Sequence, residues 1–309
     1  MVPAIFVFGD SLVDVGNNNK LPVSVAKANF PHNGIDFPTK KATGRFSNGK
    51  NAADFLAQKV GLPTSPAYLS VSRKSTSSFM TGASFASGGA GIFNGTDRTL
   101  GQSIPLTKQV GYYESVYDNL IQQQVLSGAQ KSLSKSLFAI VIGSNDILDY
   151  SGSLHASGAR KFVFAGIGPI GCIPAQRIKN QTDHGCNEGS NLMAVSYNKG
   201  LNSMLRELKS NLTAISYSYF DTYSLLLNII QNPATYGFAE AEAACCGRGK
   251  LNAQIPCLPV AKYCPSRRDH VFWDLYHPTE ATAAILVDAI FDGPKQYAFP
   301  MNVRQLVTV

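Results

Sequence analysis

A serine, a histidine and an aspartate in this sequence have the types and surroundings that serine-based acyl transfer requires. Ser11 follows the apolar run in FVFGDSL. A serine directly after a strand lies at the carboxyl edge of a parallel sheet, where α/β folds bind ligands. The pair Asp10-Ser11 could instead cap a following helix, because both residue types are common N-caps. Since a serine hydroxyl is a poor nucleophile without a base, the catalytic interpretation of Ser11 depends on a partner.

His277 is the strongest candidate for that base among the five histidines. Asp274 precedes it by three residues in FWDLYHPTE, and Pro278, a favoured first residue of a helix, follows it. On a loop before a helix, this spacing lets the carboxylate reach the imidazole and hold its tautomer, as in a catalytic triad. The alternative is a surface contact between Asp274 and His277 beside a helix cap.

Acyl transfer also needs hydrogen-bond donors for the developing oxyanion. The glycines of FASGGAG, residues 85–91, follow a predicted strand and let backbone N–H groups approach a substrate closely. Asn145, in GSND, follows another predicted strand and carries a side-chain amide that can donate. Each feature alone is also ordinary turn chemistry. Together with Ser11 and His277, they supply a nucleophile, two donors and a base at strand or loop ends.

The elements that must position these residues alternate along the chain. Short apolar runs alternate with segments of helical periodicity, which is typical of an α/β fold with a parallel sheet. Helical spacing occurs over residues 52–60, 106–120 and 193–208, and again from Pro278. No internal repeat or linker interrupts the pattern, so residues 1–309 are predicted to form a single domain. The predicted strands are residues 5–9, 84–87, 137–142, 161–167 and 215–220.

One connection is shorter than expected. Strands 137–142 and 161–167 should be parallel neighbours, which normally requires a covering helix between them. The intervening SNDILDYSGSLHASGAR contains two glycines and several serines but no amphipathic stripe. We therefore expect a crossover helix to be missing. An apolar sheet face left uncovered would cost several kcal/mol at roughly 25 cal/mol per Å², comparable with a domain's net stability of about 5–15 kcal/mol.

Composition and charge exclude several classes of protein. Hydrophobic residues make up 44% of the chain and charged residues 15%, which indicates a compact globular protein. The net charge of +7 comes from scattered lysines and arginines without a basic stripe, so no nucleic-acid partner is expected. No apolar run reaches the roughly 18 residues that span a bilayer, so no transmembrane segment is expected.

The cysteines favour an oxidising compartment. No Cys-x-x-Cys pair occurs and no histidine has zinc-finger spacing, so neither a metal nor a cofactor is predicted. Disulfides in a secreted protein are the preferred interpretation over free thiols, with the connectivity left open. The sequence nevertheless runs from Met1 straight into the first strand without a signal peptide, so either a leader was removed or this form stays inside the cell. The six cysteines are residues 172, 186, 245, 246, 257 and 264.

The sequence does not support a nucleotide-binding site or an α/β-hydrolase site. GIGPIG, residues 166–171, matches G-x-G-x-x-G after a strand, but Pro169 and Pro174 oppose a helix that begins there and Cys172 interrupts it. No GKS or GKT tail supports a phosphate loop, and the G-x-S-x-G signature of the α/β-hydrolases is absent.

The chemistry-bearing residues lie in longer motifs that resemble the plant GDSL esterase/lipases of the SGNH hydrolase superfamily. The resemblance implies a three-layer α/β/α, flavodoxin-like fold with a mainly parallel five-stranded sheet. It also implies a triad of Ser11, Asp274 and His277 and an oxyanion hole formed by Ser11 N–H, Gly88 and Asn145. Strand spacing favours Gly88 over Gly89. The motifs are FVFGDSLVDVGNNN, GIDFP, TGRFSNGK, GASFASGGAGI, VIGSNDI, GARKFVFAGIGPIGCIP, ACCGRG and FWDLYHPTE.

The resemblance further implies a secreted, cell-wall enzyme that hydrolyses lipid or cell-wall-type carboxylic esters through an acyl-serine intermediate, without metal or cofactor. Two features depart from the family pattern: the missing signal peptide and the contraction of residues 147–160. An acyltransferase that uses the same site, or a catalytically inactive truncated form, are the alternatives.

Overall fold

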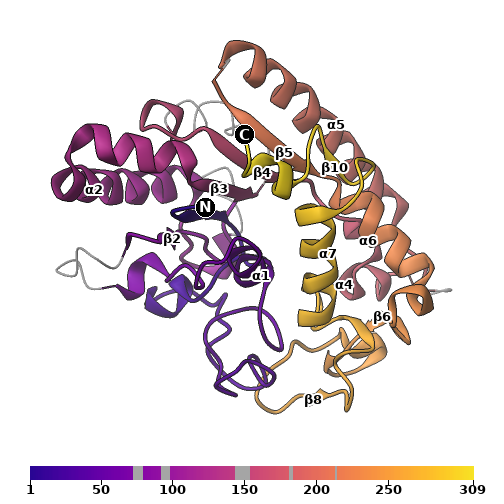
Figure 1. Ribbon diagram of the computed structural model, residues 1–309. Coiled ribbons are helices and arrows are strands. Elements are labelled where there is room, and N and C mark those ends of the chain that lie inside the picture. The colour runs from indigo at the N-terminus through magenta and orange to yellow at the C-terminus, as the bar shows by residue number, and fades with distance from the viewer. Residues whose placement is uncertain (72–78, 92–97, 143–153, 181–183, 213) are drawn as a thin grey trace.

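A six-stranded sheet lies at the centre of the computed structural model, which describes the chain except residues 72–78, 92–97, 143–153, 181–183 and 213 (Figure 1). The strand order is β10-β5-β4-β3-β1-β2; β1 to β5 pair in parallel, and only β10 is antiparallel. The order 2-1-3-4-5 of the parallel strands is that of flavodoxin-like folds, which confirms the predicted fold class. The strands are β1 (Ile5–Gly9), β2 (Gly82–Ser84), β3 (Leu137–Val141), β4 (Lys161–Ala165), β5 (Ser216–Phe220) and β10 (Ala298–Phe299).

The strands lie where the sequence predicted them, with two differences. The predicted five-stranded sheet has a short sixth strand, β10, at the outer edge of β5. The predicted strand 84–87 overlaps β2 only at Ser84, yet the backbone of Phe85 and Ser87 still donates hydrogen bonds to Val7 and Gly9 of β1. The segment therefore continues alongside β1 beyond the formal end of the strand, up to the loop that carries Gly88.

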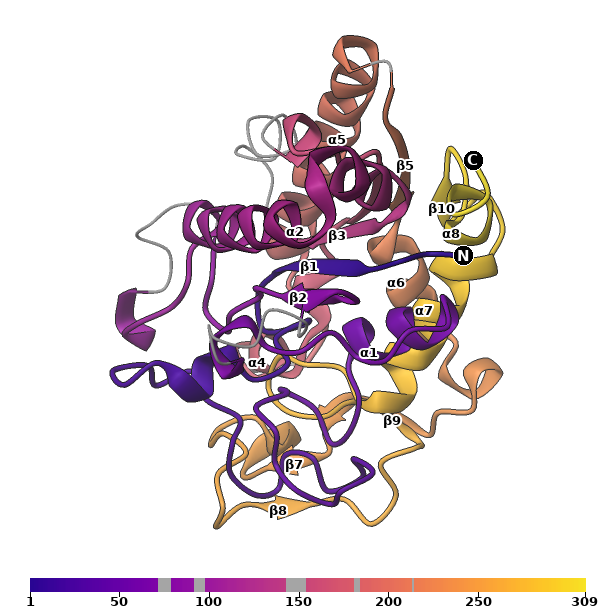
Figure 2. The same ribbon diagram turned by 60° about the vertical axis from the view of Figure 1, so that its left-hand side comes forward.

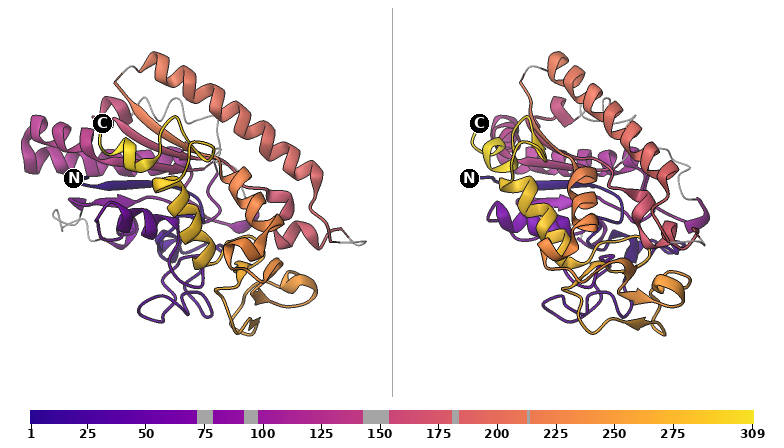
Figure 3. Two further views of the ribbon diagram at one scale, coloured as in Figure 1. Left: turned by 45° about the vertical axis from the view of Figure 1, so that its right-hand side comes forward. Right: turned by 90° about the vertical axis from the view of Figure 1, so that its right-hand side faces the viewer.

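Helices cover both faces of the sheet, which gives the three predicted layers. Figure 2 shows α2 on one side of β1 and α1 on the other, and Figure 3 shows the long α5 beside the sheet. One buried cluster joins the sheet to α1, α6 and α7, and another joins it to α2 and α5. The first cluster runs from Val2 to Leu306, so both ends of the chain contribute to it. The longer helices are α1 (Ala52–Lys59), α2 (Leu106–Lys135), α5 (Glu188–Asn211), α6 (Thr222–Gln231) and α7 (Glu280–Asp292).

Polar caps determine where two of these helices begin. The side chain of Asn51 accepts the N–H groups of Ala53 and Asp54, and Asp54 accepts the N–H of Asn51, so α1 starts with a reciprocal capping box. Thr279 caps α7 by accepting the N–H of Thr282. The helix predicted from Pro278 therefore begins two residues later, because the threonine side chain takes the cap position.

The shortened connection does not leave an apolar face uncovered. Only its end, residues 154–160, belongs to the described chain, and residues 154–156 are helical. Leu154 is buried in the cluster formed with α2 and α5. The side chains of β3 and β4 that point to this layer are at most 3% exposed: Phe138, Ile140, Phe162 and Phe164. The prediction of an uncovered sheet face is therefore wrong. Helix α2 is twice as long as the part predicted from the sequence, and it covers this face together with α5.

The remaining elements are short. Strand β6 (Glu240–Ala244) pairs with β9 (His270–Phe272) in parallel, and β7 (Cys246–Gly247) with β8 (Lys262–Tyr263) in antiparallel. Helix α4 (Pro174–Arg177) begins at a proline, where the sequence predicted no helix; proline is tolerated in the first turn because its missing N–H is not needed there. The others are α8 (Val303–Leu306), η1 (Asn17–Lys20), η2 (Tyr68–Ser70), η4 (Arg98–Leu100), η5 (Ile170–Cys172), η6 (Pro233–Tyr236) and η7 (Lys250–Asn252).

All six cysteines are paired, as the sequence predicted. Cys172–Cys186 ties the loop after β4 to the segment before α5. Cys245–Cys264 and Cys246–Cys257 tie the chain around β7 and β8, next to β9 and the segment that carries His277. In the described part of the chain, no helix combines the length and the apolar character that a membrane crossing requires.

Candidate active site

Ser11, His277 and Asp274 form one hydrogen-bonded chain. The Nε2 atom of His277 lies 2.8 Å from Ser11 Oγ. Its Nδ1 atom lies 2.8 Å from Asp274 Oδ1 and 2.9 Å from Oδ2. With the proton on Nδ1, Nε2 accepts the serine hydroxyl, which is the arrangement of a nucleophile, its base and an orienting carboxylate. No helix follows Ser11, since residues 11–13 form a turn, so the helix-cap interpretation does not apply.

The backbone before Ser11 is held by Gln109 of α2. The Gly9 N–H donates to Gln109 Oε1 at 2.9 Å, and Gln109 Nε2 donates to the Gly9 carbonyl at 2.9 Å and to the Ile104 carbonyl at 2.8 Å. The side chain of Gln109 is fully buried, so these bonds are shielded from water. Gln109 could not be predicted as a partner of Gly9, because nothing in the local sequence pattern around residue 109 points to Gly9.

The loop between β9 and α7 holds His277 in place. The Asp274 carboxylate accepts the N–H groups of Tyr276 and His277, both at 2.9 Å, in addition to the imidazole. The Trp273 N–H donates to the carbonyl of His277 at 2.8 Å. The ring of Phe46 lies against the imidazole with the centroids 5.0 Å apart. These contacts restrict the imidazole to one orientation, toward Ser11.

Burial and the ion-pair partner act in opposite directions on the triad. Burial disfavours the imidazolium, but the charge of Asp274 and its hydrogen bond outweigh that effect and hold the pKa of His277 above its usual value. Burial also opposes ionisation of Asp274, but His277 and the two backbone N–H donors keep the pKa of this carboxyl below its usual value. The pair therefore favours a negative carboxylate that stabilises a protonated histidine, as proton transfer from serine requires.

A second carboxyl, that of Asp10, belongs to the residue directly before Ser11. Its Oδ1 accepts the Leu12 N–H at 2.9 Å. Burial raises the pKa of Asp10 to about 6, while the Leu12 N–H and the nearby His277 act against that rise. Asp10 also contributes to the raised pKa of His277 through its charge. It therefore adds to the negative potential around the imidazole without a direct hydrogen bond to it.

The predicted oxyanion donors differ in their availability. The Ser11 N–H has no hydrogen-bond partner among the described residues. The Gly88 N–H, by contrast, donates to Asp14 Oδ2 at 3.0 Å, so it is not free to bind an oxyanion. The next N–H, that of Gly89, has no partner in the described part of the chain. Asn145 lies outside the described residues.

Asp14 and Asn18 hold the loop that carries these glycines. Asp14 Oδ1 accepts the N–H groups of Gly16 and Asn17 at 2.7 and 2.8 Å, while its Oδ2 accepts that of Gly88. Burial raises the pKa of Asp14 to about 6 against the effect of these donors. Asn18 Nδ2 donates to the Gly88 carbonyl at 2.7 Å. Both residues belong to the VDVGNNN part of the first motif. The run of polar residues after an apolar strand is the sequence feature that could have pointed to their role in holding the loop.

The position of Gly88 also excludes a side chain. A Cβ atom there would lie 2.6 Å from the ring of Phe46 and 2.9 Å from Asn18 Nδ2. Because Phe46 packs on His277, any side chain at residue 88 would press through Phe46 on the imidazole. Gly88 therefore lets the loop approach the triad, although its N–H is already used.

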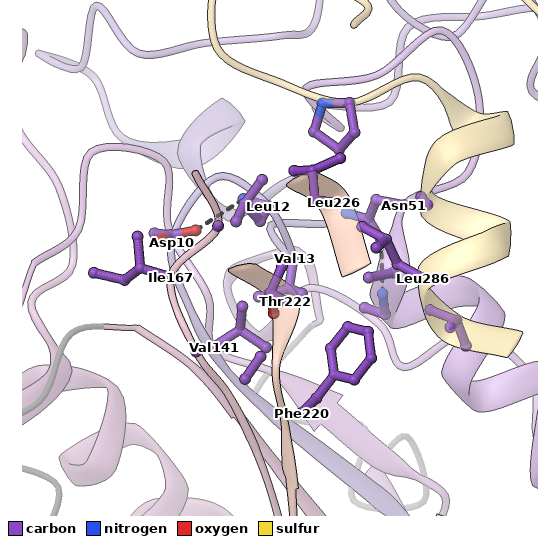
Figure 4. A pocket seen from close by; sticks show the side chains of 18 of the residues that line it. Asp10, Leu12, Val13, Asn51, Val141, Ile167, Phe220, Thr222, Leu226 and Leu286 are labelled. Atoms are coloured by element: carbon purple, nitrogen blue, oxygen red, sulfur yellow. Dashed lines mark hydrogen bonds between the residues drawn. The ribbon is translucent and has the colours of Figure 1, made fainter. Parts of the chain in front are cut away.

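An apolar cavity of about 330 Å³ opens beside the triad. Asp10, Leu12, Phe46 and Tyr276 line it near Ser11 and His277. From there it extends between the sheet and helices α1, α6 and α7, and Figure 4 shows side chains from these layers around it. Its volume lies in the range of small-molecule sites, roughly 300–1,000 Å³.

Known proteins are similar to this chain over almost its whole length. The family described as GDSL-like Lipase/Acylhydrolase matches residues 5–290. A GDSL esterase/lipase of Arabidopsis thaliana is 50% identical over 99% of this chain and 90% of its own length. A second from the same plant is 37% identical, covering 99% and 88%, and a third is 36% identical, covering 100% and 86%.

The first of these alignments also bears on the length of the chain. It extends over 340 positions, whereas this chain has 309 residues, so the relative has residues without a counterpart here. This agrees with a contracted chain. The whole-length similarity and the matched residues establish that the chain belongs to the GDSL-like lipase/acylhydrolase family.

Proposed function

We propose that this protein is a serine esterase that hydrolyses carboxylic esters of lipid or cell-wall type through an acyl-Ser11 intermediate. The observation that carries the proposal is the continuous hydrogen-bonded chain from Ser11 Oγ through His277 to Asp274. Family membership supports the same reaction class. The apolar cavity beside the triad supplies space for an ester substrate.

In the proposed first step, Ser11 Oγ attacks the ester carbonyl while His277 Nε2 takes the serine proton. The Asp274 carboxylate stabilises the resulting imidazolium. When the tetrahedral intermediate collapses, the imidazolium gives its proton to the leaving alcohol. A water molecule then attacks the acyl-serine with His277 again as base, which releases the carboxylic acid and restores the serine hydroxyl.

We propose that the oxyanion accepts hydrogen bonds from the Ser11 N–H, the Gly89 N–H and the Asn145 amide. Gly89 replaces Gly88 in this proposal because Asp14 already accepts the Gly88 N–H. Asn18 holds the Gly88 carbonyl, and in a planar trans peptide the following N–H points the opposite way. Asn145 enters through the family resemblance of GSND, which follows β3 in the sequence.

Labelling with a fluorophosphonate, which reacts with activated serines, tests the proposal. Wild type should label rapidly, and Ser11→Ala should not label. Ser224→Ala, which removes an exposed hydroxyl bonded to Asp221 on α6, is a control that should label like wild type. If wild type labels no faster than Ser11→Ala while both give cooperative thermal melts, the esterase proposal fails.

The alternatives are less well supported. An inactive form would not need the buried clamp of Gln109 on Gly9 or the exact approach of His277 to Ser11. Acyl transfer would use the same acyl-serine, and product analysis with and without an added alcohol separates it from hydrolysis. Release of free acid as the main product in water is the result expected here.

We further propose that residues 1–309 form a single domain that is secreted, in agreement with the cell-wall setting that the family resemblance implies. One buried cluster includes residues from both ends of the chain, which supports a single domain. Three disulfides suit an oxidising compartment. Fractionation of cells that express the complete gene tests the location: the protein should be recovered outside the cell, and retention in the cytosol would contradict the proposal.

A further inference from the structure

We propose that residues 23–26, together with residues 100–102, form a docking surface through which the protein binds a lipid surface that carries anionic headgroups. These two segments are called the rim ribbon, because they adjoin the loop that carries Gly88 and Gly89. Binding of lipid by the rim ribbon is independent of the esterase activity. Its consequence for hydrolysis rests on the proposed function.

The rim ribbon is a short antiparallel pair of backbone segments. Ser24 lies opposite Gly101. The Val25 N–H donates to the Leu100 carbonyl at 3.0 Å. A Cβ atom at residue 101 would collide with the Val23 carbonyl, and Gly101 has a φ of 75°, so only glycine lets the two segments approach this closely. Figure 2 shows the loop after η1 beside η4 at the left-hand edge of the molecule.

The alternation of side chains along the rim ribbon directs its valines toward solvent. Ser24 is buried, whereas Val23 and Val25 on either side of it are 73% and 69% exposed. Leu100, the residue opposite Val25, lies on the same face and is 38% exposed. Single exposed apolar side chains are common on protein surfaces, but the backbone pairing holds these three together. The valines cannot turn inward without turning Ser24 outward, because successive side chains of an extended segment point to opposite faces.

Basic side chains flank this apolar face. Lys20 precedes the first valine by three residues and is exposed, and Lys27 follows the second by two residues and is partly exposed. No aspartate or glutamate occurs in the sequence between Asp14 and Asp36. The charged side chains of this segment are therefore both lysines, which complement anionic headgroups.

A lipid surface fits this combination better than a protein partner does. Stable protein–protein interfaces bury roughly 800 Å² on each partner, which three apolar side chains do not supply. A lipid–water boundary instead accepts protruding apolar side chains singly, while basic side chains remain among the headgroups. Each lysine beside an anionic lipid surface strengthens binding by about fivefold. The rim ribbon and its flanking lysines supply both contributions.

The rim ribbon is attached to the loop beside the triad. Asn18 Nδ2 donates to the Ala26 carbonyl and to the Gly88 carbonyl, both at 2.7 Å, so one amide holds the ribbon and the loop together. A Cβ atom at residue 89 would lie 3.4 Å from Leu100 Cδ1 and 3.8 Å from the Cβ of Ala26, so the backbone of Gly89 is close to the ribbon. Docking of the rim ribbon therefore brings the loop with the proposed Gly89 donor to the lipid surface.

Flotation with lipid vesicles tests the docking surface, with the Ser11→Ala protein so that no ester is hydrolysed. Vesicles of phosphatidylcholine with about one-quarter phosphatidylserine should bind the protein, and vesicles of phosphatidylcholine alone should bind it at least about tenfold more weakly. Val23→Ser with Val25→Ser should lower the affinity for the anionic vesicles at least about tenfold. Val195→Ser with Val260→Ser removes two exposed valines outside the rim ribbon and is the matched control, which should bind as before.

The same assay tests the contribution of charge. Lys20→Gln with Lys27→Gln should lower the affinity for anionic vesicles by at least about tenfold and leave the affinity for neutral vesicles unchanged. Lys131→Gln with Lys199→Gln removes the same charge from exposed positions on α2 and α5 and should have a much smaller effect. No binding to anionic vesicles, equal binding to both kinds of vesicle, or equal losses in a ribbon variant and its control would overturn the docking surface.

Hydrolysis assays separate the docking surface from the esterase proposal. With Ser11 intact, Val23→Ser with Val25→Ser should hydrolyse dissolved p-nitrophenyl acetate like wild type. For p-nitrophenyl dodecanoate carried in the anionic vesicles, its kcat/KM should fall at least about fivefold. An equal fall for both substrates would overturn the link between docking and hydrolysis. If no ester is hydrolysed but vesicle binding depends on the rim ribbon, only the esterase proposal fails. If esters are hydrolysed but vesicle binding does not depend on the rim ribbon, only the docking surface fails.

Discussion

The Oδ2 atom of Asp14 accepts the N–H of Gly88 at 3.0 Å, although 74 residues separate the two in sequence. This bond fixes the loop after β2 to the segment that follows Ser11. It also removes the Gly88 N–H from the set of donors that an oxyanion could use. The same loop is held by Asn18 through the Gly88 carbonyl, so the next N–H, that of Gly89, has a defined direction.

Replacement of Asp14 by Asn should therefore impair catalysis through the loop. An amide can offer only one acceptor oxygen to the three N–H donors that the carboxylate now satisfies. We expect kcat for ester hydrolysis to fall by roughly 10²-fold, the effect of losing an oxyanion donor, with KM changed much less. Asp118→Asn, at an exposed position of α2, is the control. A fall in KM and kcat together, or no fall in kcat, would count against a positioning role for Asp14.

The pH dependence of kcat/KM should reflect the raised pKa of His277. The base must be neutral to accept the Ser11 proton, and Asp274 stabilises the protonated form. Activity should therefore rise with pH through an apparent pKa above the usual histidine value of about 6.5. In Asp274→Asn, the inflection should move to lower pH and kcat should fall more than KM rises. An inflection that does not move would exclude Asp274 as the partner.

Asp10→Asn should change how stability depends on pH. The pKa of Asp10 in the folded protein is raised to about 6 by burial, above the ordinary value of 3.8. Its contribution to stability is therefore fully present below pH 3.8 and is lost as the pH rises through 6. The free energy of unfolding of Asp10→Asn, relative to that of wild type, should therefore increase by about 2 kcal/mol as the pH rises from mildly acidic to neutral. Urea unfolding of both proteins across this range measures the difference, and parallel curves would contradict the prediction.

The buried ion pair of Arg45 with Asp54 should be important for stability. Arg45 donates to both carboxylate oxygens, at 2.6 and 2.7 Å, and both side chains are almost inaccessible to solvent. Arg45→Met leaves the carboxylate buried without its charge partner and should lower the free energy of unfolding by about 3–5 kcal/mol. Lys59→Met breaks an exposed pair with Asp288 and should cost at most about 1 kcal/mol. Equal losses in the two variants would show that burial of the Arg45 pair is unimportant.

Local patterns were sufficient for the order of the elements and for part of the site. Runs such as residues 137–141 are apolar throughout, as strands buried on both faces must be, so the parallel sheet could be predicted. Asp274 and His277 are three residues apart, so their contact follows from short-range geometry. Helix α6 was missed, because its ten residues follow β5 directly and its apolar run resembles a strand.

By itself, therefore, the sequence determined the α/β class and the residue types of the triad, since these depend on periodicity and on near neighbours. Only the tertiary structure decided which glycine N–H remains free, that Gln109 holds Gly9, and that helices α2 and α5 cover the face beside the shortened connection. It alone also produced a cavity between the sheet and the helices on its other face. These features arise from contacts between residues tens to hundreds of positions apart, and no local pattern encodes which distant partner a buried polar group or a small side chain will meet.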